Sequence, residues 1–171
     1  MRASPLISAL GALAIAAGCG GDGSDDGRSE EKATTPASSG AAFVERADRI
    51  CASYQAANAR LAEESDNSSP AQIAESTARA EALIERRLLP GLRELTPPAG
   101  DGDVIAEFVS LIERQAQFLH RISAAAEVRD GGRVRRALAR LDRVRARTQV
   151  LADDYGFEVC GPPSEGDLHD E

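Results

Sequence analysis

The chain has 171 residues, of which 42% are hydrophobic and 28% are charged, and its formal net charge is −8. This length accommodates one domain with a hydrophobic core together with terminal segments. The negative charge gives no electrostatic basis for binding DNA or RNA, so no nucleic-acid partner is expected. Aromatic residues make up only 4% and tryptophan is absent, which favours a helical core built from Leu, Ile, Val and Ala.

The first segment combines a short positive start with a short apolar run. Arg2 precedes the apolar residues 5–17, which are too few to span a bilayer and are typical of a signal peptide. Residues 16–19, with the sequence AAGC, resemble the lipobox of bacterial lipoproteins. The resemblance implies that residues 1–18 are a lipoprotein signal peptide. It also implies that Cys19 is acylated, as in palmitate-bearing lipoproteins, and becomes the first residue after cleavage.

Residues 19–40 are expected to be the lipidated cysteine and a flexible linker. Almost no large apolar residue occurs there, so the segment cannot bury enough surface to offset its ordering entropy. Two acyl chains on Cys19 would hold the protein stably at the extracytoplasmic face of the bacterial cell membrane. The alternative is a secreted protein with an incidental Cys19. Residues 162–171 are expected to be a disordered acidic tail.

Residues 41–161 contain four segments with apolar residues at helical spacing. The second starts at Ser69-Pro70, a pattern typical of a helix N-cap. The fourth includes Leu138 on its apolar face and is expected to end at Gly156. Short connectors between the segments predict an all-α domain, an antiparallel up-down-up-down four-helix bundle.

Pro90 interrupts the apolar pattern of the second segment. A proline inside a helix lacks the backbone N–H and clashes with the preceding turn, so Pro90 is expected to kink or end the helix. The alternative architecture is a bundle of three helices, with the second segment docked loosely beyond Pro90.

Two further cysteines lie near one end of the predicted bundle. Cys51 is in the first segment and Cys160 lies just past the fourth, so an antiparallel arrangement brings them within reach of each other. With Cys19 taken by lipid, the remaining count is even, and an exported chain meets an oxidising compartment. We therefore predict a structural disulfide between Cys51 and Cys160. A redox-active pair is the alternative, although the chain has no C-x-x-C motif.

Three short motifs carry a resemblance that covers residues 41–161. ADRIC at residues 47–51, LTPP at residues 95–98 and the Tyr-Gly-x-x-x-Cys-Gly ending at residues 155–161 resemble a group of small actinobacterial lipoproteins and secreted proteins. That group has no assigned activity. The resemblance implies the helical bundle and the disulfide, and it implies no catalytic residue.

The chain offers few residues for catalysis or metal binding. His120 lies beside the apolar face of the third segment without the Glu-x-x-His pairs of a bundle metal site, so a boundary histidine is expected. His169 lies in the acidic tail, which would bind a divalent cation weakly at most. Neither a nucleophile elbow nor a phosphate-binding loop occurs. We therefore expect no catalytic residue, no metal site, no cofactor and no enzymatic activity.

The fourth segment is rich in arginine, with Asp142 the only acid among its arginines. Arginines near a helix N-terminus oppose the helix dipole, so an anionic group is expected to offset them. One hypothesis is pairing within the bundle, with acids of the third segment (Glu107, Glu113) and of the first (Glu45, Glu63, Glu64). The other is a docking face for an anionic partner, such as lipid headgroups, an envelope protein or an anionic polymer. The residues of this predicted face are Arg133, Arg136, Arg140, Arg143 and Arg147.

Together these features favour a lipid-anchored extracytoplasmic domain that binds a partner and catalyses no reaction. The alternative function is a carrier that holds a small apolar or metal ligand in the bundle core. A cavity lined by Tyr54 and His120 would favour the carrier, whereas a filled core with arginines lacking ion pairs would favour the docking domain.

Overall fold

The computed structural model describes residues 40–65 and 67–161. The predicted signal peptide, the acylated Cys19 with its linker up to residue 39, and the tail 162–171 lie outside the described residues. Within these ranges every regular element is helical, as expected. None of the described helices has the length and apolar character needed to cross a bilayer.

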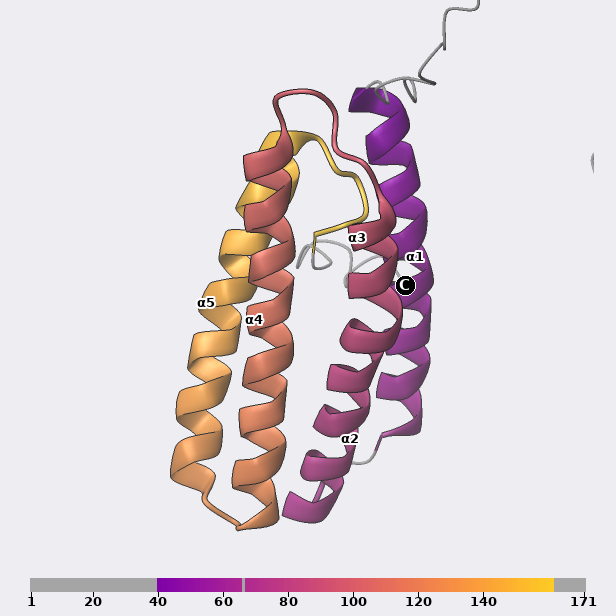
Figure 1. Ribbon diagram of the computed structural model, residues 1–171. Helices are drawn as coiled ribbons and strands as arrows, with labels where there is room; N and C mark the ends of the chain where they lie inside the picture. The colour runs from indigo at the N-terminus through magenta and orange to yellow at the C-terminus, as the bar shows by residue number, and fades with distance from the viewer. Residues whose placement is uncertain (1–39, 66, 162–171) are drawn as a thin grey trace, which may run out of the picture. The chain divides into compact units, whose positions relative to one another are not determined.

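The elements follow one another up and down along the bundle (Figure 1). Helix α4 packs against both α5 and α2, whereas α1 packs against the continuous helix formed by α2, η1 and α3. The four-helix bundle predicted from the sequence is therefore confirmed, and its first helix begins one residue earlier than expected. The elements are α1 (Gly40–Glu64), α2 (Pro70–Leu83), η1 (Ile84–Leu88), α3 (Leu89–Glu94), α4 (Gly102–Glu127) and α5 (Gly131–Tyr155).

The second helix begins at its predicted cap. The Ser69 hydroxyl accepts a hydrogen bond from the Gln72 backbone N–H at 3.3 Å, and Pro70 occupies the first helical position. A serine oxygen at this position satisfies one of the amide groups that an isolated helix start leaves without a partner.

Pro90 does not end the second helix, because the turn before it is widened. Residues 84–88 form the π-helical turn η1, in which the Leu89 N–H donates to the Ile84 carbonyl five residues earlier. Such a turn rearranges the carbonyls that a regular α-helix would press against the proline ring. The leucines beside Pro90, Leu88 and Leu89, are buried in the core, so the alternative of a loosely docked second segment is wrong.

Helix α3 lies close against α1 at a glycine. A methyl group added at Gly91 would come within 2.9 Å of Ile50 Cγ2, which is closer than carbon atoms approach in proteins. The absence of a side chain at Gly91 therefore allows the two backbones to pack at this point.

Helix α4 contributes more buried residues to the core than any other described element, as its wide apolar face predicts. Phe108 and Ile122 lie on this face and are almost fully buried. On α5 the prediction is partly wrong, because Leu138 is 41% exposed and Ala137 is buried instead. The buried face of α5 consists of Ala137, Leu141, Thr148 and Ala152, and Leu138 lies outside it.

The chain reverses direction after α5. Gly156 adopts the left-handed conformation with φ of 91°, and the Phe157 N–H donates to the Ala152 carbonyl at 2.9 Å. This helix ending is the one predicted at Gly156. It turns residues 157–160 back from α5 toward α1 (Figure 1).

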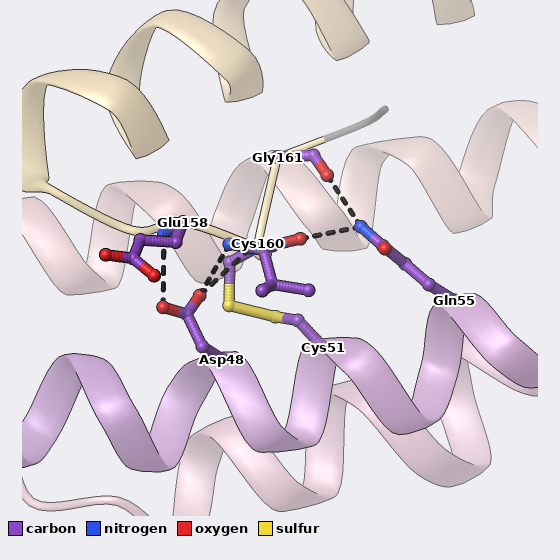
Figure 2. Close-up of a disulfide and its surroundings, with 7 residues drawn as sticks. Asp48, Cys51, Gln55, Glu158, Cys160 and Gly161 are labelled. Atoms are coloured by element: carbon purple, nitrogen blue, oxygen red, sulfur yellow. Dashed lines mark hydrogen bonds between the residues drawn. A yellow bond between two sulfur atoms is a disulfide. The ribbon is translucent and has the colours of Figure 1, made fainter. Parts of the chain in front are cut away.

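The returning segment is held by side chains on one face of α1 (Figure 2). The Asp48 carboxylate accepts hydrogen bonds from the backbone N–H groups of residues 158–160 at 2.9–3.1 Å. Cys51 forms a disulfide with Cys160, as predicted. The Gln55 amide donates to the carbonyls of Val159 and Gly161 at 2.6 and 3.0 Å. Because residues 48, 51 and 55 follow helical spacing, α1 offers all three from one side.

An aromatic cluster fills the space beneath this segment. The Phe157 ring lies 5.0 Å from Phe108 of α4, 6.2 Å from Phe43 of α1 and 4.9 Å from Tyr155, measured between centroids. The Tyr155 hydroxyl donates to the Asp101 carboxylate at 2.7 Å. Burial, together with that hydrogen bond and the negative charge of Asp101, raises the pKa of Tyr155 to about 12.

Replacing Asp48 with alanine removes the acceptor of three backbone N–H groups. We expect the free energy of unfolding of the oxidised protein to fall by about 2 kcal/mol, because partly buried donors would lose a charged acceptor. Denaturant titration measures this change. The control is Asp142→Ala on α5, an exposed carboxylate for which a change within about 0.5 kcal/mol is expected. Equal stability of the two variants would contradict the role assigned to Asp48.

Candidate functional site

The five arginines predicted as a docking face form one exposed row on α5. They follow one another at intervals of three, four, three and four residues, which places them on one side of the helix. This side borders the buried face that carries Ala137, Leu141 and Thr148. The residues of the row are Arg133, Arg136, Arg140, Arg143 and Arg147.

The two ends of this row are paired with carboxylates, and its middle is not. Arg147 forms an ion pair with Glu107 of α4, and Arg133 pairs with Asp130 at 3.1 Å. Within residues 40–65 and 67–161, no carboxylate oxygen lies within 4.0 Å of the guanidinium nitrogens of the other three arginines of the row.

Of the five acids expected to neutralise α5, only Glu107 forms an ion pair with it among the described residues. The prediction is wrong for the other four, of which Glu63 forms no ion pair with a described residue. Glu113 pairs with Arg93 of α3 at 2.6 Å, and two acids of α1 pair elsewhere: Glu45 with Arg49 at 2.7 Å, and Glu64 with Arg79 at 2.9 Å. Each of these three acids is paired with an arginine of α1, α2 or α3, and among the described residues no ion pair joins α1 to α5.

The paired and unpaired arginines border an open groove between α4 and α5. Its volume is about 340 Å³, and its lining combines guanidinium groups with an apolar floor. We call this feature the arginine groove. Its lining residues are Phe118, His120, Arg121, Ala124 and Ala125 of α4 together with Arg133, Arg136, Ala137 and Arg140 of α5.

Arg121 belongs to the groove and was missed by sequence reasoning. Its guanidinium carbon lies 5.0 Å from the centroid of the Phe118 ring, in a cation–π contact. A signal for it exists in the sequence, since Arg114, Phe118, Arg121 and Ala125 recur at intervals of four, three and four along one side of α4. The intervals do not reveal that this side borders the arginine row of α5.

One carboxylate, Asp130, lies beside Arg133 of the groove and accepts a backbone hydrogen bond. Its Oδ1 accepts a hydrogen bond from the Arg133 N–H at 2.9 Å, which caps the start of α5. That hydrogen bond lowers the pKa of Asp130 below its ordinary value, and the positive charges of Arg133 and Arg136 lower it further. Asp130 is therefore ionised at neutral pH, and it neutralises only this end of the row.

The groove suits an anionic group with an apolar portion. Guanidinium groups donate pairs of hydrogen bonds to carboxylate and phosphate oxygens, and their planar shape favours such bidentate contacts. The lining residues include no cysteine, serine or carboxylate, and His120 is the lining residue whose side chain can exchange a proton near neutral pH. The guanidinium groups of the groove are therefore arranged to suit an anion.

Of the remaining candidate residues, His120 borders the arginine groove. The His120 side chain is 70% exposed and its Nδ1 lies 3.3 Å from Glu81 Oε1, so it occupies the surface of α4. Among the described residues, no group of three or more His, Cys, Asp or Glu side chains is arranged to hold a metal ion. Cys51 and Cys160 are buried and bonded to each other. His169 lies outside the described residues.

The chain matches no model of a known protein family, no curated protein and no solved structure. Its function is therefore argued from the geometry of the bundle and the groove.

Replacing Arg136 and Arg140 together with glutamine is expected to leave the free energy of unfolding within about 0.5 kcal/mol of the original value. Neither side chain forms an ion pair with a described residue, and both repel the other arginines of the row. Thermal denaturation measures the difference. A loss of more than about 1 kcal/mol would show that the bundle needs these arginines for its stability.

Proposed function

We propose that the protein is a non-enzymatic binding domain, anchored by a lipid on Cys19 at the extracytoplasmic face of the bacterial membrane. The arginine groove would receive the anionic partner. One observation carries this proposal: Arg136, Arg140 and Arg143 pair with no described carboxylate, although the chain contains 28 acidic residues. A cluster of exposed charges of one sign without ion pairs is typical of an interaction surface.

Two features support the proposed location. The apolar residues 5–17 lead directly to the sequence AAGC that ends at Cys19, which resembles a lipoprotein signal and its acylated cysteine. The disulfide between Cys51 and Cys160 suits an oxidising compartment, because disulfides of this kind are reduced in most cytosols. The resemblance to small actinobacterial lipoproteins agrees with both features.

The carrier hypothesis finds less support in the geometry. It requires a ligand cavity between the helices, lined by Tyr54 and His120. Tyr54 packs against the core cluster, whereas the His120 side chain is mostly exposed on α4, so the two do not line one interior space. The binding domain is therefore the function that we propose.

A resin that carries phosphate groups tests whether the groove binds anions. At pH 7 a chain with net charge −8 is retained on such a resin only through a local cationic surface. We expect the Arg136→Gln/Arg140→Gln variant to elute at lower salt than the unaltered protein. The control is Arg86→Gln/Arg87→Gln on η1, which removes the same charge from two other exposed positions. Equal elution of the two variants would refute the groove as the anion-binding surface.

The lipid anchor is tested separately by replacing Cys19 with serine. We expect the variant to leave the membrane fraction, because the acyl chains supply the stable anchorage. Fractionation of cells that express either form measures the change, and a metabolically incorporated fatty-acid label should appear only on the form that retains Cys19. Labelling that persists in the variant would contradict acylation at this residue.

A further inference from the structure

We infer that the arginine groove and the adjoining turn between α4 and α5 bind the anionic phospholipid headgroups of the membrane. This inference rests on the proposed function and names its partner. The bundle would then lie with the α4–α5 end against the bilayer, in addition to being attached through Cys19.

The first argument is the shape of the charged surface. From Arg133 to Arg143 the row on α5 extends over about 15 Å at the rise of an α-helix. Arg114 and Arg121 are exposed on the facing side of α4 and add a second row beside it. Guanidinium groups on two adjacent helices, on both sides of the groove, offer sites for several anionic groups at once, which fits the phosphates of a headgroup layer better than a single acidic side chain.

The second argument is the turn between the two helices. Val128 is 68% exposed at the end of α4, where it follows Arg121 by seven residues and so lies on the same side of the helix. Arg129 and Arg133 are exposed on either side of Asp130. An exposed apolar side chain between arginines is typical of protein surfaces that enter the interface between water and lipid.

The third argument is the backbone conformation of Arg129. Its φ is 55°, and within the described residues no other non-glycine residue has a positive φ. The Asp130 N–H donates to the Ala125 carbonyl at 2.9 Å, so Arg129 occupies the position of a helix ending that glycine normally takes. An arginine is unfavourable there for the fold, which indicates that its charge serves another purpose.

The charges on the α4–α5 face also set an orientation. At the opposite end of this face lie carboxylates: Glu107, which pairs with Arg147, and the exposed Asp103 and Asp154. The end that holds the α4–α5 turn carries Glu127 and Asp130, and Asp130 is paired with Arg133. Because Arg121, Arg129, Arg133 and Arg136 outnumber these two acids, contact with an anionic bilayer is favoured through this end.

The attachment at Cys19 permits this orientation. Helix α1 starts at the bundle end opposite the α4–α5 turn (Figure 1). The residues between Cys19 and Gly40 span up to about 70 Å when extended. The 25 residues of α1 measure about 38 Å. The connecting segment is therefore long enough for the α4–α5 end to reach the membrane that holds the lipid, where the headgroups are at high effective concentration.

The test is vesicle binding by residues 20–171, the mature chain without its acylated cysteine, which contains every described residue and both disulfide cysteines. Vesicles of phosphatidylglycerol mixed with phosphatidylcholine should sediment the protein, and pure phosphatidylcholine vesicles should not. Raising the salt concentration should weaken binding. Arg136→Gln/Arg140→Gln should reduce the affinity roughly tenfold or more, whereas Arg86→Gln/Arg87→Gln should change it less than about threefold.

Arg129→Gly provides a second variant that separates binding from folding. Glycine suits the left-handed position better, so the melting temperature should stay the same or rise, while vesicle affinity should fall about threefold or more. If Arg129→Gly binds vesicles as well as the unaltered chain, the role assigned to the turn is wrong.

The remaining outcomes overturn the inference in distinguishable ways. Equal binding to neutral and anionic vesicles would show that headgroup charge is not recognised. Retention on the phosphate resin without any vesicle binding would overturn the lipid inference and leave the proposed anion-binding function in place. Retention on immobilised polyglutamate instead of vesicles would identify an acidic protein as the partner class.

Discussion

The carboxylate of Asp48 accepts three successive backbone N–H groups from a segment that has already passed the end of the last helix. This contact matters because α1 packs on α2, η1 and α3, whereas α5 packs on α4. The segment after α5 lies between these two parts of the bundle and bonds to α1 through Asp48, Gln55 and the disulfide (Figure 2). Its Phe157 ring packs on Phe43 of α1 and Phe108 of α4, which adds an apolar connection at the same place.

The disulfide and the hydrogen bonds reinforce each other. A covalent link between Cys51 and Cys160, 109 residues apart, reduces the entropy of the unfolded chain. The carboxylate fixes the backbone of the same short segment, so its N–H groups have partners although no helix or strand supplies them. Gly156 allows residues 157–160 to reach α1, because its left-handed conformation turns the chain back immediately after α5.

The same topology explains why the arginines of α5 remain without ion pairs. Glu45 and Glu64 of α1 pair with Arg49 of α1 and Arg79 of α2. Helix α4 is the main helical neighbour of α5, and α1 meets α5 through Phe43 and Tyr155. Near the α4–α5 turn the groove-facing side of α4 carries Arg121 in place of an acid. An acidic chain therefore presents one strongly cationic surface, and that separation of charge underlies both the proposed binding function and its lipid partner.

The amino-acid sequence by itself determined the local features of this protein. The four helical segments, the Ser69-Pro70 start, the ending at Gly156 and the pairing of Cys51 with Cys160 all follow from spacing, capping chemistry and cysteine count. The row of five arginines is likewise visible as a helical repeat. These features depend on residues close together in the chain, or on the one long-range pairing that the number of cysteines allows.

The tertiary structure alone decided the features that depend on which helices are neighbours. The helix continues through a π-helical turn before Pro90, and Leu88 and Leu89 are thereby buried in the core. Helix propensities of single residues predict neither the turn nor this burial. Leu138 is exposed because the neighbouring helices cover the side of α5 that carries Ala137 and Leu141. Asp48, Gln55 and Arg121 appear as ordinary surface residues until the fold brings their partners to them. Contacts between residues far apart in the chain leave no periodic signal in the sequence, and for that reason only the packed bundle reveals them.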